Sequence, residues 1–408
     1  MVETMMKKKV LIMPSYWPSS QDPAVGAQVQ EQTILIADHF DVKVLFCVGG
    51  MGLMRYFVNS LLSLVTGSFL FKSCINKFSN GGIEMHGYFF CDNQILPYSW
   101  RRNNELKAVF SIYAKLESDG WKPDLIHART AEYAGYCGAK LSQSKRIPLL
   151  LTENVIFVLR DIPSLIKVNE YIFALETAQK VAVVSTWLKT QLLINNINCK
   201  PVVIGNWVNE SKFHLQRDIN NEFTILTIGH TGFTKDWTTF FKSIKYLVDE
   251  CGCVDFKVLI IVTQTYDRES RAYIPDKIAE YELQNWIDVR YQISREEIAQ
   301  VFQRANVFVS TSLNETFGIA TAESMFSGVP VVATDNGGIN DFIADLNGIK
   351  VNIGDYKAVA DAILKIKSKS VEFKPEIIRD SVLKKFGTDV FKNKLVQLYY
   401  DTIKTSEM

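Results

Sequence analysis

The stretch that most constrains the fold of this chain covers residues 306–343. It reads as a short apolar strand at 307–309, a polar connection, a helix at 318–327 and a second buried strand at 329–333. Gly328 stands where a glycine often ends a helix. The unpaired N–H groups and the positive dipole end at the helix start suit a phosphate group. The stretch therefore predicts a β-loop-α-β unit with an anion-binding helix end.

Two carboxylates bracket the start of this helix. Glu315 lies in the loop before it and Glu323 lies within it, too far apart in sequence to form a close acid–base pair. Their spacing suits the hydroxyl groups at two ends of a long ligand, such as a nucleotide sugar. The residues alone also allow a second interpretation, in which both side chains face solvent and stabilise the helix dipole.

The letters E-T-F-G-I-A-T-A-E, followed by S-G-V-P-V-V-A-T and G-G, resemble the E-x7-E signature of retaining GT-B glycosyltransferases of the family-4-like group. The resemblance implies that Glu315 binds hydroxyls of the donor sugar and that Glu323 binds the nucleotide ribose. It also implies that backbone N–H groups between them contact the donor. The residues that would present these groups are Thr316, Phe317, Gly318 and Ile319.

Composition limits the possible partners. The chain has 408 residues, of which 47% are hydrophobic and 22% charged, which is typical of a soluble globular protein with room for two cores. A net charge of +1 argues against nucleic acid as the main partner. Seven cysteines without a C-x-x-C pair indicate reduced thiols in a cytosolic protein. No D-x-D segment occurs, so neither a metal ion nor another cofactor is expected.

Strands and helices alternate in both halves of the chain, which predicts two parallel-sheet α/β domains. We expect a Rossmann-like acceptor-binding domain at 1–205, a polar linker at 206–221 and a Rossmann-like donor-binding domain at 222–385. The resemblance implies the GT-B arrangement, in which the two sheets face each other across a cleft. It also implies that a last helix, at 386–408, packs back on the first domain.

A glycine near the start of the chain is a further candidate. An apolar strand at 9–13 leads through a long loop to a predicted helix at 27–39, with Val29 and Ile34 among its apolar positions. The segment D-P-A-V-G-A-Q-V-Q-E-Q resembles the corresponding loop and helix of the same family. Gly26 is thereby a candidate to approach the donor phosphates, although such a glycine is most often a simple turn residue.

Two strand ends in the first half resemble motifs that line the acceptor side of the family's cleft. The segment D-L-I-H-A-R, which ends at Arg129, resembles the family's "DxxHxH" pattern. The segment L-T-E-N, which ends at Asn154, resembles the family's "TEH" pattern. The resemblance makes His127 and Arg129 candidate catalytic residues. Arg129 stands where a second histidine is usual, and Asn154 stands where a histidine often follows Thr-Glu. His127 is open to two interpretations, a site residue or a satisfied structural histidine.

The segment G-H-T-G-F-T-K resembles the family's G-R-x4-K pattern, whose arginine and lysine neutralise the donor diphosphate. Lys235 keeps the lysine, and His230 replaces the arginine. Because histidine titrates near neutral pH, we expect His230 to serve when protonated and activity to depend more strongly on pH. Without this context, Lys235 would be interpreted as a solvated loop lysine.

Residues 51–78 have the pattern of a basic amphipathic helix. Apolar residues such as Phe57 and Leu61 recur at helical spacing, and no acidic residue occurs between Val42 and Ile83. The apolar run is shorter than the roughly 20 residues that span a bilayer. It therefore lies in a membrane interface or packs on its own domain's sheet. The excess of five basic residues in 1–205 favours the membrane, and we expect a cytoplasmic protein peripheral to its inner face.

The resemblance implies a retaining, metal-independent transfer of a sugar from a UDP- or GDP-sugar donor to a hydroxyl of a glycan or lipid-linked acceptor, in surface polysaccharide or glycolipid assembly. Lys235, Glu315 and the two strand-end residues His127 and Arg129 are the expected catalytic residues. Two alternatives stay open: a non-catalytic nucleotide-sugar-binding protein, and a nucleotide-sugar epimerase of the same architecture.

Overall fold

The chain forms two compact units, each with its own sheet. The computed structural model describes residues 7–18, 26–51, 76–80, 83–91, 95–155, 165–215, 222–264 and 268–405. The first unit comprises Met1–Val183, Lys189–Ile204 and Lys392–Met408. The second comprises Val184–Leu188 and Gly205–Phe391.

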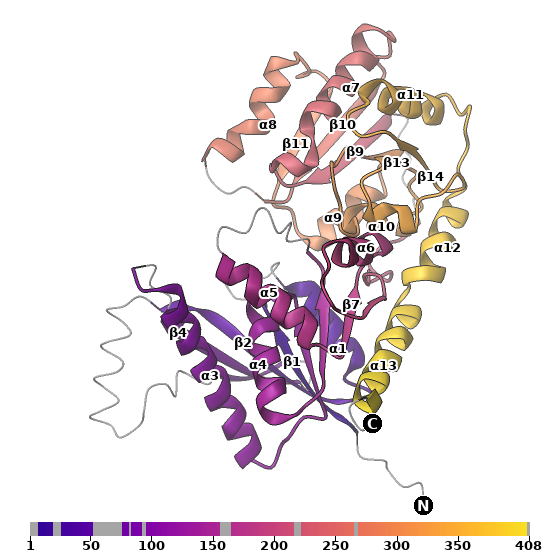
Figure 1. Ribbon diagram of the computed structural model, residues 1–408. Coiled ribbons are helices and arrows are strands. Elements are labelled where there is room, and N and C mark those ends of the chain that lie inside the picture. Colours follow the sequence, from indigo (N-terminus) through magenta and orange to yellow (C-terminus); the bar gives the residue numbers. More distant parts are fainter. Residues whose placement is uncertain are drawn as a thin grey trace, which may run out of the picture. The chain divides into compact units, whose positions relative to one another are not determined.

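The first unit is built on an eight-stranded sheet in the order β3-β4-β2-β1-β5-β6-β7-β8 (Figure 1). The strands are β1 Lys9–Pro14, β2 Asp41–Met51, β3 Asn76–Asn80, β4 Ile83–Cys91, β5 Leu125–Arg129, β6 Leu149–Glu153, β7 Lys180–Val183 and β8 Pro201–Val203. All neighbours pair in parallel except β3, which is antiparallel to β4. The central strands β5 and β6 are buried along their whole length, as expected for a parallel sheet covered on both faces.

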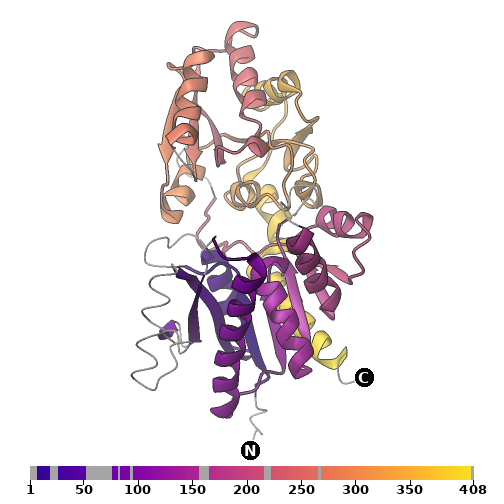
Figure 2. The same cartoon turned by 60° about the vertical axis from the view of Figure 1, so that its left-hand side comes forward.

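Helices cover both faces of this sheet. They are α1 Ala27–Ile36, α3 Tyr98–Ser118, α4 Tyr136–Lys145, α5 Leu165–Thr177, α6 Thr186–Ile194 and α13 Thr388–Thr405, with a π-helical turn η1 at Ala131–Gly135. Helices α3, α4 and α5 lie side by side on one face (Figures 1 and 2). On α13, the buried Tyr399 packs at a tilt against Phe40, which follows α1, with ring centroids 5.0 Å apart. The last helix of the chain therefore completes the core of the first unit.

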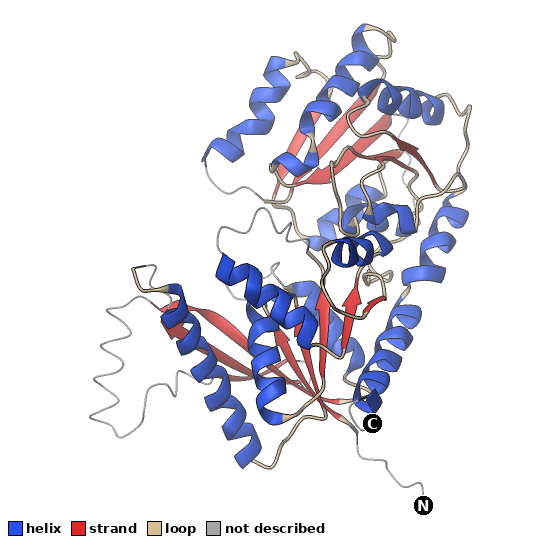
Figure 3. Ribbon diagram, viewed as in Figure 1, coloured by secondary structure: helices blue, strands red, loops and turns tan. Residues whose placement is uncertain are grey.

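The second unit is built on a six-stranded, fully parallel sheet in the order β11-β10-β9-β12-β13-β14. Its strands are β9 Phe223–Gly229, β10 Phe256–Val262, β11 Ile287–Tyr291, β12 Val307–Ser310, β13 Val331–Thr334 and β14 Gly348–Val351. Its helices are α7 Trp237–Asp249, α8 Arg268–Glu280, α9 Arg295–Phe302, α10 Ile319–Phe326, α11 Tyr356–Lys367 and α12 Pro375–Phe386 (Figure 3). Two one-turn helices, η2 Phe233–Lys235 and η3 Gly338–Asp341, follow β9 and β13.

The core of this unit lies mainly between the sheet and helices α7 and α11. Phe240 and Phe241 of α7, Val258 and Ile260 of β10, and Ile363 of α11 are at most 1% exposed. Successive side chains of a strand point to opposite faces of the sheet. Val258 and Ile260 of β10 face this core, and Lys257 and Leu259 therefore point to the other face.

The prediction of two parallel-sheet α/β units is confirmed. The strands predicted at 9–13 and 307–309 lie within β1 and β12. One helix differs: α1 ends at Ile36, its Ile34 is 42% exposed, and the polar Gln32 and Thr33 are buried instead. Thr33 is accommodated because its hydroxyl donates a hydrogen bond to the carbonyl of Val29, one turn earlier.

Two further sequence-based expectations meet the structure only in part. Residues 206–215, expected as the start of a polar linker, are counted in the second unit, where Trp207 and Phe213 are buried. Of the amphipathic stretch 51–78, Met51 ends β2 and β3 begins at Asn76; the rest lies outside the described residues. Within the described ranges, no helix has both the length and the apolar character needed to cross a bilayer.

Candidate functional site

The predicted donor-site residues of the second unit gather at the carboxyl ends of β9 and β12, which are neighbours in the second sheet. Lys235 ends η2 after β9, and Glu315 lies in the loop after β12. The Lys235 ammonium forms an ion pair and a hydrogen bond with the Glu315 carboxylate. The Ser312 hydroxyl donates to the same carboxylate oxygen over 2.8 Å. Both charged side chains are 19% exposed, so the pair remains within reach of a ligand.

Backbone hydrogen bonds hold these two loops in place. The Leu313 N–H donates to the Thr234 carbonyl over 2.8 Å, which ties the β12 loop to the β9 loop. The Glu315 N–H donates to the Asn336 carbonyl over 3.0 Å, and the Gly338 N–H donates to the Glu315 carbonyl over 2.8 Å. The position of the lysine–carboxylate pair is therefore set by main-chain contacts on both sides.

The helix that follows, α10, begins at a position that only glycine suits. Gly318 has φ of 91°, and a Cβ there would lie 2.8 Å from the Ile339 side chain. No side chain among the described residues caps this helix start. Phe317 is a core residue, packed against the rings of Phe342 and Phe386 at centroid distances of 5.2 and 5.0 Å. It can therefore reach a ligand only through its backbone; Thr316 and Ile319 beside it are half-buried.

Glu323 is a buried carboxylate on α10 that pairs with a cation from α9. It is 3% exposed, and its oxygen lies 3.2 Å from a guanidinium nitrogen of Arg295. Arg295 is the first residue of α9, whose start is fixed by a capping box between Ser294 and Glu297. Arg295 belongs to none of the motifs identified in the sequence. A signal was present, since a cation in the first helical turn opposes the helix dipole and needs another reason to be there.

His230 lies in the loop after β9, and its ring forms a hydrogen bond with the backbone. Its Nδ1 accepts a hydrogen bond from the Gly232 N–H over 2.9 Å. Burial and the nearby Lys235 lower the pKa of His230, while Glu315 acts in the opposite direction. The neutral ring is therefore favoured in this structure, which revises the expectation of a protonated His230 near neutral pH. Protonation would need an added anion beside it.

The local backbone structure explains why position 26 is a glycine. Gly26 precedes α1 with φ of 76°, and a Cβ there would lie 2.6 Å from the Tyr16 carbonyl oxygen. The close approach of these two backbone segments requires glycine. Its implied role toward donor phosphates stays a prediction.

His127 and Arg129 lie inside the first unit. His127 has no exposed surface, its Nδ1 lies 2.6 Å from the Tyr399 hydroxyl and its Nε2 lies 2.7 Å from the Thr152 hydroxyl. Burial, and then Arg129, hold the pKa of His127 well below its usual range. Burial lowers the pKa of Arg129 to about 10. These contacts support the structural interpretation of His127, and they give no support to the catalytic role that the resemblance implied for either residue.

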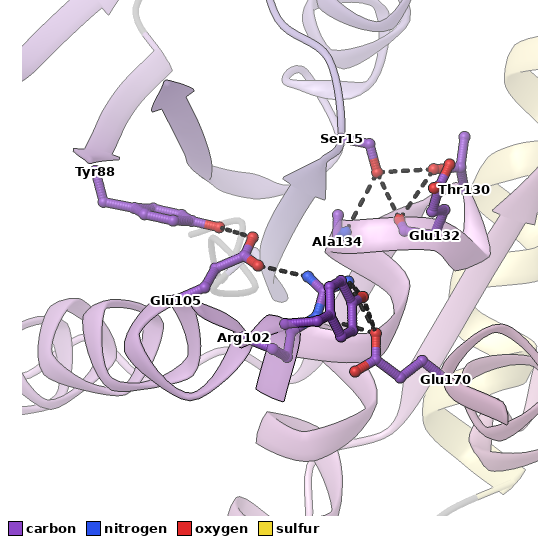
Figure 4. A network of polar contacts seen from close by, with 9 residues as sticks. Ser15, Tyr88, Arg102, Glu105, Thr130, Glu132, Ala134 and Glu170 are labelled. Carbon is purple, nitrogen blue, oxygen red and sulfur yellow. Dashed lines mark hydrogen bonds and ion pairs between the residues drawn. The ribbon is translucent and has the colours of Figure 1, made fainter. Parts of the chain in front are cut away.

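A polar network in the first unit was not predicted. Figure 4 shows Glu105 between Tyr88 and Arg102, with Glu170 on the other side of the guanidinium. Arg102 pairs with Glu105 and, over 2.9 Å, with Glu170; the Tyr88 hydroxyl donates to Glu105 over 3.1 Å. Burial raises the pKa of Glu105, against the opposing effect of Arg102. The network links β4, α3 and α5, and a motif search misses it because its members lie far apart in the chain.

A strained turn follows β5 at the carboxyl edge of the first sheet. Thr130 and Tyr133 have φ of 72° and 53°, which is costly for residues other than glycine. Ser15 holds the turn, since its hydroxyl contacts the Thr130 hydroxyl at 2.7 Å and donates to the Glu132 carbonyl over 2.8 Å (Figure 4). The buried Glu153, whose pKa burial raises to about 7, accepts the Ala131 N–H over 2.8 Å. Glu153 of the T-E-N segment is thus an anchor for the turn.

Comparisons with known proteins agree with this architecture. The chain is 27% identical over 201 residues to 2-deoxystreptamine N-acetyl-D-glucosaminyltransferase of Niallia circulans, an alignment that covers 49% of this chain and 48% of that one. The chain thus spans about half the length of this relative. The structure of sucrose-phosphate synthase from Thermosynechococcus elongatus aligns with a TM-score of 0.74 at 18% identity, over 98% of this chain and 100% of that one. The structure of HepE of Anabaena in complex with UDP aligns with a TM-score of 0.71 at 16% identity, over 97% of this chain and 100% of that one.

The arrangement of two Rossmann-like units is the GT-B fold, which these solved structures share. Residues 209–380 fit the family model described as glycosyl transferases group 1. In the described part of the chain, no three His, Cys, Asp or Glu side chains come together as a metal site.

Proposed function

We propose that this protein transfers a sugar from a nucleotide-sugar donor, with retention of configuration and without a metal ion, to an acceptor hydroxyl. The observation that carries the proposal is the Lys235–Glu315 pair next to the glycine-started helix α10. Lys235 provides one fixed ammonium, and the start of α10 provides a set of backbone N–H donors next to it. A nucleoside diphosphate is the ligand chemistry that uses both.

The main chemical demand of this reaction is the charge that develops on the leaving diphosphate. Lys235 and the N–H groups at the start of α10 would stabilise that charge, because they are held in place before the donor arrives. Glu315 would then orient the sugar through its hydroxyls while keeping Lys235 in position. We propose that a leaving-group phosphate oxygen takes the acceptor proton, so that no separate general base is needed.

Glu323 would accept hydrogen bonds from the ribose hydroxyls. Arg295 lies 3.2 Å from this carboxylate and would compensate its charge in the buried site. The structure of a relative in fold, HepE, was solved with UDP. We therefore propose a uridine nucleotide as the first donor to test, with GDP-sugars as the second.

The test is thermal stability of the protein with UDP, GDP, ADP or CMP. A ligand at 100 times its Kd stabilises the folded state by about 2.7 kcal/mol and raises Tm accordingly. We expect one nucleotide to raise the Tm of the wild type and to lose most of this effect with Glu323→Gln, which keeps the size of the side chain. Glu296→Ala, an exposed carboxylate on α9, is the matched control and should respond as the wild type does.

If no nucleotide shifts the Tm of the wild type, the donor site proposed here is wrong. If Glu323→Gln responds as strongly as the wild type, the nucleotide binds without the ribose contact. In that case the role given to Glu323 fails while the donor site stands.

One observation favours a second function. The neutral, backbone-bonded His230 stands where the family pattern has a charged arginine, which lowers the positive charge available to a leaving diphosphate. A protein that binds a nucleotide sugar without transferring it would tolerate this change. Release of UDP from UDP-glucose in the presence of a glycan acceptor separates the two functions. Analysis of the sugar without acceptor also detects an epimerase.

We also propose that the acceptor is a glycan or a lipid-linked sugar at the inner face of the membrane. This part rests on the basic amphipathic pattern of residues 51–78 and on the basic excess of residues 1–205.

A further inference from the structure

A groove opens on the second unit at the amino ends of its edge strands. It has a volume of about 360 Å³ and is lined by the first residues of β10 and β11 together with the last turn of α9. Lys257, Arg290 and Arg304 contribute its cationic side chains, and Trp286 contributes an indole. A volume of this size is within the range of small-molecule sites, which is roughly 300–1,000 Å³.

The groove is separate from the proposed donor site within this unit. Lys235 and Glu315 follow the carboxyl ends of β9 and β12, whereas the groove is lined by Thr224 near the start of β9 and Lys257 near the start of β10. In a parallel sheet, the amino ends of all strands lie on one side and the carboxyl ends on the other. A ligand in the groove would therefore leave the donor loop free.

The charges of the groove are not balanced by the protein. Three basic side chains line it against one carboxylate, Asp288. Asp288 lies 3.9 Å from Arg290, at the limit of an ion pair. The Lys257 ammonium donates to the Asn285 carbonyl over 2.9 Å, which fixes the charge without neutralising it. Within the described residues, the Arg304 guanidinium makes neither a hydrogen bond nor an ion pair.

The wall of the groove is preorganised around these charges. The Trp286 indole N–H donates to the Val254 carbonyl over 3.1 Å, which fixes the plane of the ring. Arg304 follows α9, whose other end carries the capping box. Two guanidinium groups and an ammonium around one small volume match the oxygens of a phosphate, and a fixed indole offers a flat face to a sugar ring.

We propose that this groove binds a small phosphomonoester, such as a sugar phosphate, at a site distinct from the donor loop. The phosphate contacts Arg304 and Arg290, the Lys257 ammonium adds charge, and the body of the ligand lies against Trp286. The proposal is independent of whether the donor loop binds a nucleotide.

The test is isothermal titration calorimetry of the full chain with glucose 6-phosphate, inorganic phosphate and glucose. Glucose 6-phosphate is expected to bind and glucose is not. Arg304→Ala should weaken the binding about 10-fold or more, since a charge-assisted hydrogen bond is worth about 1.5–3 kcal/mol. Lys384→Ala removes an exposed cation from α12, away from the groove, and should leave the binding unchanged.

Lys235→Ala locates the bound phosphate. Binding that persists in this variant and is lost in Arg304→Ala supports the groove. Binding lost in Lys235→Ala but retained in Arg304→Ala would place the phosphate at the donor loop and overturn the proposal. Equal binding of glucose, or no binding of either phosphate to the wild type, would overturn it as well. Because Arg304 is exposed, an unchanged Tm confirms that the variant is folded.

Discussion

Two histidines of this chain illustrate how far the role of a residue depends on its surroundings. His127 has both ring nitrogens in hydrogen bonds and no contact with solvent. His230 is partly exposed in the β9 loop, and one of its ring nitrogens accepts a hydrogen bond from a backbone N–H. Both have lowered pKa values, mainly through burial. Only His230 is placed where a ligand could change its protonation.

The buried His127 leads to a prediction about stability and pH. Its pKa in the folded state is lowered, so the contribution of neutral His127 is complete above the unfolded-state pKa of about 6.5 and is lost as the pH falls. His127→Gln should be less stable than the wild type at pH 7.5. This difference should narrow by up to about 1.4 kcal/mol per pH unit below pH 6.5, because only the wild type loses stability through this group.

Urea unfolding of both proteins at pH 7.5, 6.5 and 5.5 measures this difference. The comparison between variant and wild type removes the effect of Glu153, whose raised pKa of about 7 makes stability change in the opposite direction over the same range. His39→Gln, at an exposed position, controls for the loss of one imidazole. A difference that stays constant with pH would show that His127 titrates equally in both states.

At the scale of elements, the start of α10 is the most sensitive feature of the proposed donor site. Gly318→Ala places a methyl group 2.8 Å from Ile339 at φ of 91°. We expect a loss of about 1–2 kcal/mol of folding free energy from the left-handed backbone, together with weaker nucleotide binding because the helix start must shift. Nucleotide-dependent Tm shifts measure the second effect.

Gly354→Ala is the matched control for this change. Gly354 also has positive φ, of 79°, but a Cβ there meets no atom within 4 Å. Both variants should lose folding stability, and only Gly318→Ala should lose nucleotide affinity. Equal affinity in the two variants would mean that α10 does not contact the nucleotide.

Elements with a simple apolar pattern could be predicted from the sequence. The apolar runs predicted as strands at 9–13 and 307–309 lie within β1 and β12. The turn after β5 could not be found, because Thr130 and Tyr133 adopt positive φ only under the constraint of Ser15 and Glu153 from other strands. No local preference signals such tertiary strain.

The same distinction holds for the site. Lys235 and Glu315 belong to recognisable loop patterns, and the structure brings them into contact because β9 and β12 are neighbours. The pairing of Glu323 with Arg295 joins two successive helices, α10 and α9, with β12 between them, and no spacing rule connects the two residues. The groove near Arg304 depends on three strands and a helix and has no motif at all.

At the scale of the whole molecule, charge is distributed unevenly along the chain. Residues 1–205 have five more basic than acidic residues, and residues 206–408 have four more acidic than basic ones. This asymmetry and the amphipathic pattern of residues 51–78 predict binding to anionic vesicles. Replacing Phe57, Leu61 and Leu62 by serine should abolish vesicle cosedimentation, because an interfacial helix is held by its apolar face.

The control replaces Asn59 and Ser63, on the expected polar face, by alanine and should still sediment with the vesicles. If the triple serine variant binds vesicles as well as the wild type does, the membrane contact proposed for this stretch is wrong.

The first unit is completed by a helix from the other end of the chain. Tyr399 of α13 fills its core beside Phe40 and donates to or accepts from His127. During synthesis, Phe40 and its apolar neighbours therefore stay incompletely buried until residues 392–405 have left the ribosome. At about 5–20 residues per second, the intervening second unit takes roughly 10–40 s to make. A nascent chain of this protein thus carries an incomplete first unit while its second unit is being made.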